Sequence, residues 1–187
     1  MSVPQSYAVT GEGNRWENIG AMMNRGIEVA IDGDIIRMND FTWNLSANFS
    51  YNKNKLLELY NGVEEYVNST TGLKYMVGHS VTEYFLNRYA GVNPANGDAL
   101  WYTADGELTT EFREDDKVMT GKTYESPWAG GFGTTFIWKG ISLSAQFSWM
   151  ADRWVMNNDR FFEESNGLYS TYNQSRRLLY DRWKKPG

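Results

Sequence analysis

The sequence lacks cysteine altogether and has only one histidine and four prolines among its 187 residues. The absence of cysteine excludes disulfides, thiolate zinc sites and cysteine nucleophiles. Eighteen basic residues against 23 acidic ones give a net charge of −5. This charge argues against a nucleic-acid partner, because phosphate binding requires a basic face. No segment approaches the ~18 consecutive apolar residues of a membrane-spanning helix, but a membrane-spanning β-strand is only half apolar and is not excluded.

Aromatic residues are abundant, at 16% of the chain, and the scarcity of proline suits long strands because proline removes a ladder donor. In residues 41–52 and 141–151, mostly apolar side chains alternate with polar ones, and this period of two predicts strands. In the first segment one face carries Phe41, Trp43, Leu45, Ala47, Phe49 and Tyr51, and the other carries Thr42, Asn44, Ser46, Asn48, Ser50 and Asn52.

Each of these strands has an upstream partner that predicts a hairpin. Residues 26–37 precede a turn at 38–40, and residues 129–138 precede the turn Lys139-Gly140, where glycine accepts a positive φ. Pairing Trp138 with Ile141 aligns the apolar faces of the second hairpin, as register requires. Pairing Ile35 with Phe41 in the first hairpin would place Gly33 opposite Trp43.

The sequence therefore predicts an all-β antiparallel meander with strands at 26–37, 41–52, 129–138 and 141–151. The long connections at 53–127 and 152–187 are expected to carry short helical or hairpin pieces. Short turns at one end and long loops at the other are typical of a transmembrane β-barrel. Ten residue steps at ~3.3 Å, tilted by ~40°, span about 25 Å of membrane. The alternative from pattern alone is a soluble secreted β-sandwich that binds carbohydrate, although its strands would be unusually long.

In the barrel interpretation, the apolar face contacts lipid and the polar face lines the lumen. The residues predicted to face lipid are Ile27, Val29, Leu45, Ala47, Phe49, Leu143, Ala145 and Phe147. The residues predicted to face the lumen are Asn44, Ser46, Asn48, Ser144 and Gln146.

Catalytic candidates are weak, so the sequence predicts no enzyme, no cofactor and no metal site. His79 is a lone histidine that has no cysteine or second histidine to complete a zinc site or a familiar triad. The acidic clusters at 64–65, 114–116 and 163–164 are typical of solvated loops. A glycoside hydrolase, which needs two carboxylates at a set separation, is therefore the weakest functional interpretation of the sequence. Asn93, Asn96, Asp98 and Asp105 could offer oxygen ligands to calcium, but turn formation explains them better.

Aromatic residues in the predicted outer loops are candidates for contact with a ligand or a partner. They are Trp101, Tyr102 and Trp154, for which packing within the loops is the competing explanation. Residues 174–183 predict a short loop helix with Leu179 and Trp183 on one face.

Several segments resemble, in the same order, the late barrel strands and loops of the SusC/RagA family of TonB-linked outer-membrane receptors. They are 18–29 (NIGAMMNRGIEV), 49–56 (FSYNKNKL), 77–81 (VGHSV), 84–85 (YF), 88–94 (RYAGVNP), 96–98 (NGD), 100–102 (LWY), 105–106 (DG), 138–143 (WKGISL) and 182–187 (RWKKPG). The family usually has proline near 79 or 80 and glycine near 82 and 87, where this sequence has His79, Ser80, Thr82 and Asn87.

The resemblance implies that residues 1–187 are an internal part of a longer receptor of the bacterial outer membrane in Bacteroidetes. Neither a basic and apolar leader nor a plug domain is recognisable in the chain. The family imports glycans, sometimes peptides, with energy from TonB and with a SusD-like lipoprotein that covers the extracellular mouth. This part would supply four barrel strands and two outer loops, and would transport nothing alone.

Overall fold

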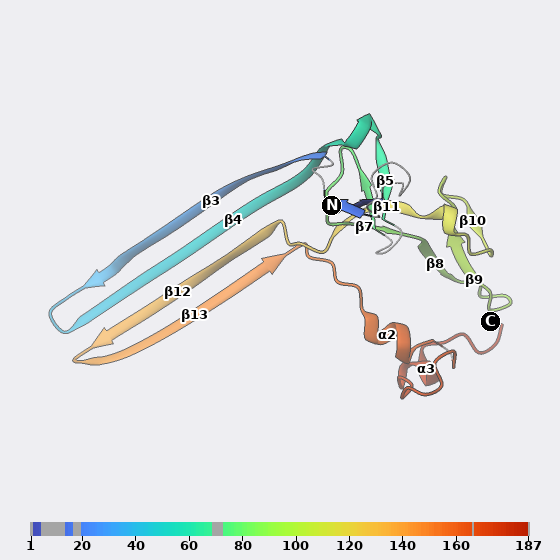
Figure 1. Ribbon diagram of the computed structural model, residues 1–187. Coiled ribbons are helices and arrows are strands. Elements are labelled where there is room, and N and C mark those ends of the chain that lie inside the picture. The colour runs from blue at the N-terminus through green and yellow to red at the C-terminus, as the bar shows by residue number, and fades with distance from the viewer. Residues whose placement is uncertain (1, 5–13, 17–19, 69–72, 166, 187) are drawn as a thin grey trace. The chain divides into compact units, whose positions relative to one another are not determined.

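The computed structural model describes residues 2–4, 14–16, 20–68, 73–165 and 167–186 (Figure 1). The described residues exclude 18 and 19, which begin the first segment quoted for the family resemblance, and 187, which ends the last one. The chain divides into two compact units. Unit 1 is Met1–Tyr84 with Gly121–Trp154, and unit 2 is Phe85–Thr120 with Val155–Gly187.

A four-stranded antiparallel sheet dominates unit 1 (Figure 1). Its strands are β3 (Gly20–Arg37), β4 (Phe41–Leu59), β12 (Trp128–Trp138) and β13 (Ile141–Ala151), in the order β13-β12-β4-β3. The two hairpins that the alternation predicts are therefore present and lie side by side. The first hairpin is longer than predicted at the end away from its turn, because pairing between β3 and β4 continues up to Gly20 opposite Leu59.

The second hairpin has the predicted register. Trp138 lies opposite Ile141 and Phe136 opposite Leu143. Lys139 and Gly140 form the two-residue turn, with φ values of 46° and 84°. Two consecutive positive φ values twist the chain in the sense that matches right-handed strands, which explains why glycine stands at the second position.

The first hairpin departs from the predicted register through a β-bulge at Ile35. Gly33 lies opposite Leu45, not Trp43, and Ile36 takes the place opposite Trp43. The bulge has a clear physical reason: without it, the observed pairing of Arg37 with Thr42 would carry Asp34 onto the apolar face. With the bulge, Asp34 lies on the polar face and accepts a hydrogen bond from the Asn44 amide at 3.3 Å.

A second irregularity lies at the other end of the hairpin, where Met22 pairs with Leu56 and Ala21 with Glu58. The extra residue, Leu57, puts Leu56 and Leu59 on the same face of β4. Both are buried, at 6% and 4% exposure. Residues 78–79 complete the free edge of β4 there, because the Leu56 N–H donates to the His79 carbonyl and the Gly78 N–H to the Leu56 carbonyl, each at 2.8 Å.

The remaining elements are short. Strands β1 (Ser2–Pro4) and β2 (Asn14–Trp16) pair, as do β5 (Glu65–Val67) with β6 (Lys74–Met76) and β7 (Glu83–Leu86) with β11 (Val118–Thr123), and the turn helices are η1 (Tyr60–Gly62) and η2 (Glu114–Asp116). Unit 2 contains the sheet β10-β9-β8, made of β8 (Arg88–Val92), β9 (Ala99–Tyr102) and β10 (Leu108–Thr109), and helices α2 (Asn158–Glu163) and α3 (Arg177–Tyr180).

The two helices differ from the sequence prediction. Helix α3 lies within the predicted segment but has only four residues. Trp183 lies beyond its end, where its indole N–H donates to the Pro94 carbonyl at 3.1 Å instead of extending a helical face. The position of helix α2 was not predicted, although Asn157 caps it by accepting the Arg160 N–H at 3.1 Å. Among the described residues, no helix has the length and apolar character needed to cross a membrane.

We expect Gly140→Val to destabilise the second hairpin by about 1–2 kcal/mol, because a side chain is disfavoured in the left-handed region. Lys139→Asn is the matched control and should cost nothing, since asparagine tolerates positive φ. Urea titration of a receptor that contains this segment, followed by intrinsic tryptophan fluorescence, measures the difference. Equal stability of the two variants would contradict the turn assignment.

Candidate functional site

The apolar side chains of the four long strands gather on one face of the sheet. Across the register, Ile27 lies opposite Tyr51, Val29 opposite Phe49, and Phe132 opposite both Ala47 and Phe147. All eight residues predicted to face lipid are on this face: Ile27, Val29, Leu45, Ala47, Phe49, Leu143, Ala145 and Phe147. Many are strongly exposed; Ile27 is 65% exposed and Leu143 67%. Such a contiguous apolar surface on a single sheet is typical of an interaction surface.

Polar and small residues occupy the opposite face. The five residues predicted to face a lumen share it: Asn44, Ser46, Asn48, Ser144 and Gln146. Glycines of β12 lie opposite several of them; Gly133 faces both Ser46 and Gln146. Since glycine has no side chain, the Ser46 and Gln146 side chains pack over Gly133, where a Cβ atom would lie 2.7 Å from the Ser46 hydroxyl oxygen.

Aromatic rings mark both ends of the apolar face. At the end with the tight turns, Trp43 stacks on Phe136 with ring centroids 5.6 Å apart, and its indole N–H donates to the Thr134 hydroxyl at 2.8 Å. At the other end, Trp128 packs against Tyr51 at 4.2 Å and Phe49 at 5.7 Å. Rings with an apolar body and a polar edge favour the boundary between lipid and water.

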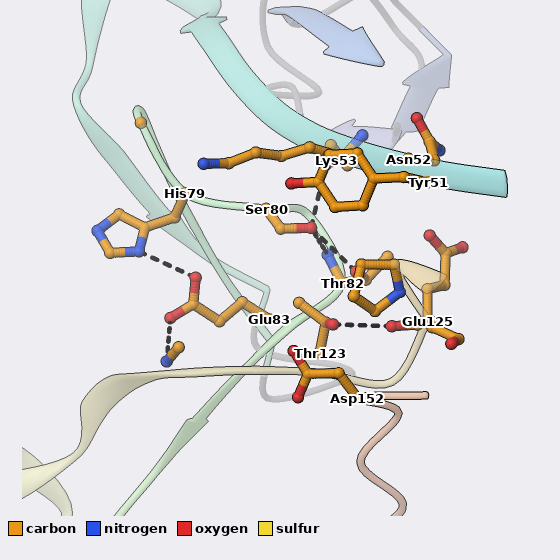
Figure 2. Close-up of a pocket in the computed structure, with 15 residues that line it drawn as sticks. Tyr51, Asn52, Lys53, His79, Ser80, Thr82, Glu83, Thr123, Glu125 and Asp152 are labelled. Atoms are coloured by element: carbon orange, nitrogen blue, oxygen red, sulfur yellow. Dashed lines mark hydrogen bonds and ion pairs between the residues drawn. The ribbon is translucent and has the colours of Figure 1, made fainter. Parts of the chain in front are cut away.

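A cavity of about 260 Å³ lies in unit 1, where β4 leaves β12 and meets residues 78–83 (Figure 2). Asn54 organises it. The Asn54 carbonyl oxygen accepts the Val81 N–H at 2.9 Å and the Ser80 hydroxyl at 3.2 Å, while its amide donates to the Asn24 carbonyl oxygen at 2.8 Å. One side chain therefore ties the loop to two strands.

Glu83 is the second organising residue of this cavity (Figure 2). The residue is only 6% exposed. One carboxylate oxygen accepts the Gly121 N–H at 2.6 Å, and the other lies 3.0 Å from Nδ1 of His79. A buried carboxylate requires such partners, since burying a charge without them is costly. His79 is thus a structural partner of the Glu83 carboxylate.

The candidate contact residue Trp154 belongs to unit 1 and is 46% exposed. Its indole N–H donates to the Asp152 carboxylate at 3.1 Å, and Nζ of Lys122 lies 4.2 Å from the ring centroid. The backbone also holds it, because its N–H donates to the Thr123 carbonyl at 2.9 Å. The ring is thus fixed and partly open, as a contact residue must be.

Trp101 and Tyr102 belong to unit 2, on strand β9. Trp101 packs edge-on against Tyr89 at 5.2 Å and Phe112 at 5.1 Å, and it is half-buried. Its main contacts are therefore within its own loop, the competing explanation from sequence. Tyr102 is 36% exposed, and the Arg88 guanidinium lies 5.5 Å from its ring centroid.

An open groove of about 1,050 Å³ in unit 2 was not predicted from the sequence. Apolar walls come from Tyr89, Trp101, Leu178 and Trp183, and charged side chains such as Glu164 line the rest. The hydrogen bond from Arg160 holds the pKa of the Glu164 carboxyl below its usual range, so this group is ionised at neutral pH. No sequence pattern connects residues so far apart in the chain.

The polar residues at 93–105 form turns, as the sequence favours. The Asn96 amide donates to the Asp98 carboxylate at 2.6 Å, and the Asn93 side chain accepts the Ala95 N–H at 3.0 Å. Gly97 and Gly106 have φ values of 85° and 92°. Within the described part of the chain, no three acidic or histidine side chains are close enough to hold a metal ion.

Comparison with known proteins identifies the architecture. No family model matches the chain. It is 27% identical over 80% of its length to TonB-dependent receptor P39 of Formosa agariphila, and 32% identical over 45% of its length to TonB-dependent receptor SusC of Bacteroides thetaiotaomicron. The structure of the RagAB peptide transporter superimposes on 97% of the chain with a TM-score of 0.86 and 31% identity. A structure of the RagAB peptide importer in an open-open state matches equally well, with a TM-score of 0.86.

The chain is a segment of a SusC/RagA-type TonB-dependent receptor. It spans 18% of the length of receptor P39 and 21% of the RagAB chain. The four-stranded sheet of this receptor segment is accordingly part of a β-barrel wall, as the alternation of its strands predicts. The short turns at 38–40 and 139–140 lie at one rim of that wall, and the longer connections lie at the other.

We expect Glu83→Ala in the receptor to destabilise the loop over the cavity by about 1–3 kcal/mol, because the Gly121 N–H loses its acceptor. Glu83→Gln is the matched control, since its amide oxygen can still accept that hydrogen bond. Hydrogen exchange of the peptide covering residues 118–123, measured by mass spectrometry, should accelerate in the alanine variant and much less in the glutamine variant. Unchanged exchange in both would contradict the role assigned to Glu83.

Proposed function

We propose that the whole receptor imports a nutrient across the outer membrane of a Gram-negative bacterium, with energy from TonB and together with a SusD-like lipoprotein. The observation that carries this proposal is the similarity of 97% of the chain to the RagAB peptide transporter, at a TM-score of 0.86. The segment spans about a fifth of that chain, so the remaining parts of the receptor would supply the TonB contact and the closure of the barrel.

The cargo we propose is a peptide or a glycan. The RagAB relative is a peptide transporter, which favours a peptide for this receptor. The relatives are receptors and transporters and not enzymes, and we assign the chain no catalytic role. Growth of a strain that lacks the receptor, on a peptide mixture or on glycans as the limiting nutrient, separates the two classes of cargo.

The soluble β-sandwich is the alternative that the structure disfavours. A sandwich buries the apolar face of each sheet against a second sheet about 10 Å away. Within the described residues of unit 1, no second sheet covers the apolar face of the four long strands, and Val29 and Phe147 on it are 51% and 55% exposed. A lipid bilayer is the environment that accepts such a face, and we assign lipid contact to it and the aqueous lumen to the opposite face.

We expect Leu45→Arg in the whole receptor to impair barrel assembly, whereas Ser46→Arg is tolerated. Leu45 lies in the middle of β4 on the apolar face, where an arginine at the bilayer midplane costs about 2–4 kcal/mol. Ser46 lies on the other, polar face opposite Gly133, where a long side chain would extend into the aqueous lumen. The measurement is the amount of heat-modifiable receptor in outer-membrane fractions.

The pair Leu143→Arg and Ser144→Arg repeats the test on β13, where both positions are exposed. A soluble sandwich would also distinguish the faces, so a polarity-sensitive probe at position 45 must decide. Quenching of that probe by lipid-borne quenchers supports the importer. A probe shielded from lipid, in a protein that stays monodisperse without detergent, would replace the importer with the sandwich.

We also propose that Trp154, with Trp101 and Tyr102, contacts the cargo or the lipoprotein. Trp154→Ala should lower import several-fold without lowering the amount of receptor, because its ring is held rigidly but remains partly exposed. Trp149→Phe is the control, because Trp149 is also a tryptophan but lies on the apolar face. Uptake of a labelled cargo, normalised to receptor in the membrane, is the readout, and unchanged uptake by Trp154→Ala would remove this residue from the contact surface.

A further inference from the structure

Basic residues follow the apolar face at the end of the sheet away from the tight turns, which we call the outer rim. The last apolar pair on that face is Ile27 opposite Tyr51. Along the same face, two residues further from the tight turns, Arg25 lies opposite Lys53, and the next pair is Met23 opposite Lys55. All three cations are exposed. We call Arg25, Lys53 and Lys55 the rim cations.

The pairing of the rim cations is unfavourable for the isolated protein. Directly opposed residues have their Cβ atoms about 4.5–5.5 Å apart, and like charges at that distance repel. In the described part of the chain, none of the three side chains has an ion pair or a hydrogen bond that would offset the repulsion. Glu58 is the next carboxylate on this face, opposite Ala21, and lies beyond the Met23–Lys55 pair. An external anion would relieve the repulsion.

The distance of the rim cations from the apolar face, measured along the membrane normal, indicates which kind of anion they can reach. Two residues of strand rise about 7 Å, which is about 5 Å along the membrane normal at a tilt of ~40°. The headgroup layer on each side of a bilayer is about 5–7 Å thick. Tyr51 and Trp128, whose rings lie 4.2 Å apart, mark the boundary just below. Arg25 and Lys53 therefore lie at the level of lipid phosphates, and Lys55 lies two residues further out.

We propose that the rim cations bind the phosphate group of an anionic lipid in the outer leaflet and so fix the height of this wall in the membrane. The inference rests on the proposed membrane function, because it takes the apolar face to contact lipid. It adds a lipid-binding site at the rim of the apolar face; of the rim cations, Lys53 also lines the cavity described above. The two paired cations, Arg25 and Lys53, hold the phosphate, and Lys55 extends the positive surface.

The test uses the whole receptor in phosphatidylcholine vesicles, with a fluorophore on a single cysteine at Met23→Cys; this segment has no cysteine of its own. The probe lies beside the rim cations on the same face. A small fraction of the lipid is brominated on its chains near the headgroup, either as phosphatidylglycerol or as phosphatidylcholine. We expect brominated phosphatidylglycerol to quench about fivefold more effectively, the factor expected for one cation at an anionic surface.

The preference should disappear in the triple variant Arg25→Ser, Lys53→Ser, Lys55→Ser, and it should weaken in 1 M salt. The matched control is Arg176→Ser, Lys184→Ser, Lys185→Ser, which removes the same charge from three exposed residues of unit 2 and should keep the preference. A second probe at Val29→Cys, in the middle of the apolar face, reports lipid contact by itself.

The possible outcomes distinguish the lipid site from the proposed membrane function. Equal quenching by both lipids at position 23, with quenching at position 29, overturns the lipid site and leaves the importer intact. A preference that survives in the triple variant also overturns the site, because other groups would then cause it. Quenching at neither position overturns the membrane placement of the sheet and, with it, the proposed function.

Discussion

Strand β4 is paired along both of its edges, and unit 1 depends on that continuous ladder. Strand β3 covers one edge from Arg37 to Gly20, while β12 and then residues 78–79 cover the other. An unpaired backbone group in hydrocarbon costs several kcal/mol, so a membrane wall requires this pairing. The ladder also sets which side chains share a face. A slip of one residue would exchange the apolar and polar faces of a whole strand.

The two β-bulges of the first hairpin protect that separation of faces. Near the tight turn, the bulge at Ile35 keeps Asp34 with Asn44 on the polar side and returns Ile36 to the apolar side. Near the outer rim, the extra residue Leu57 places two leucines on the inner side, where the loop covers them. Both bulges lie outside the stretch where the faces must remain regular. The wall thus combines a regular middle with two irregular ends that connect it to turns and loops.

Beyond the long strands of unit 1, buried and partly buried polar groups hold the loop in place of a large hydrophobic core. Asn54 binds residues 80–81 and Asn24, and Glu83 binds His79 and the Gly121 backbone. Leu56 and Leu59 are the buried apolar residues among those that the structure describes. Hydrogen bonds of this kind are directional, so they define one loop conformation over the cavity. The loop therefore presents one defined surface.

The sequence by itself determined the four strands, the turns at 38–40 and 139–140 and the two faces, because alternation and turn chemistry are local properties of the chain. The register of the second hairpin followed for the same reason, since Lys139 and Gly140 leave one pairing. Only the tertiary structure decided the bulges, because an extra residue changes register without changing composition. It also decided the partners of Asn54 and Glu83, the short helix α3 and the groove of unit 2. Those depend on contacts between residues far apart in the chain, and no local pattern encodes such contacts.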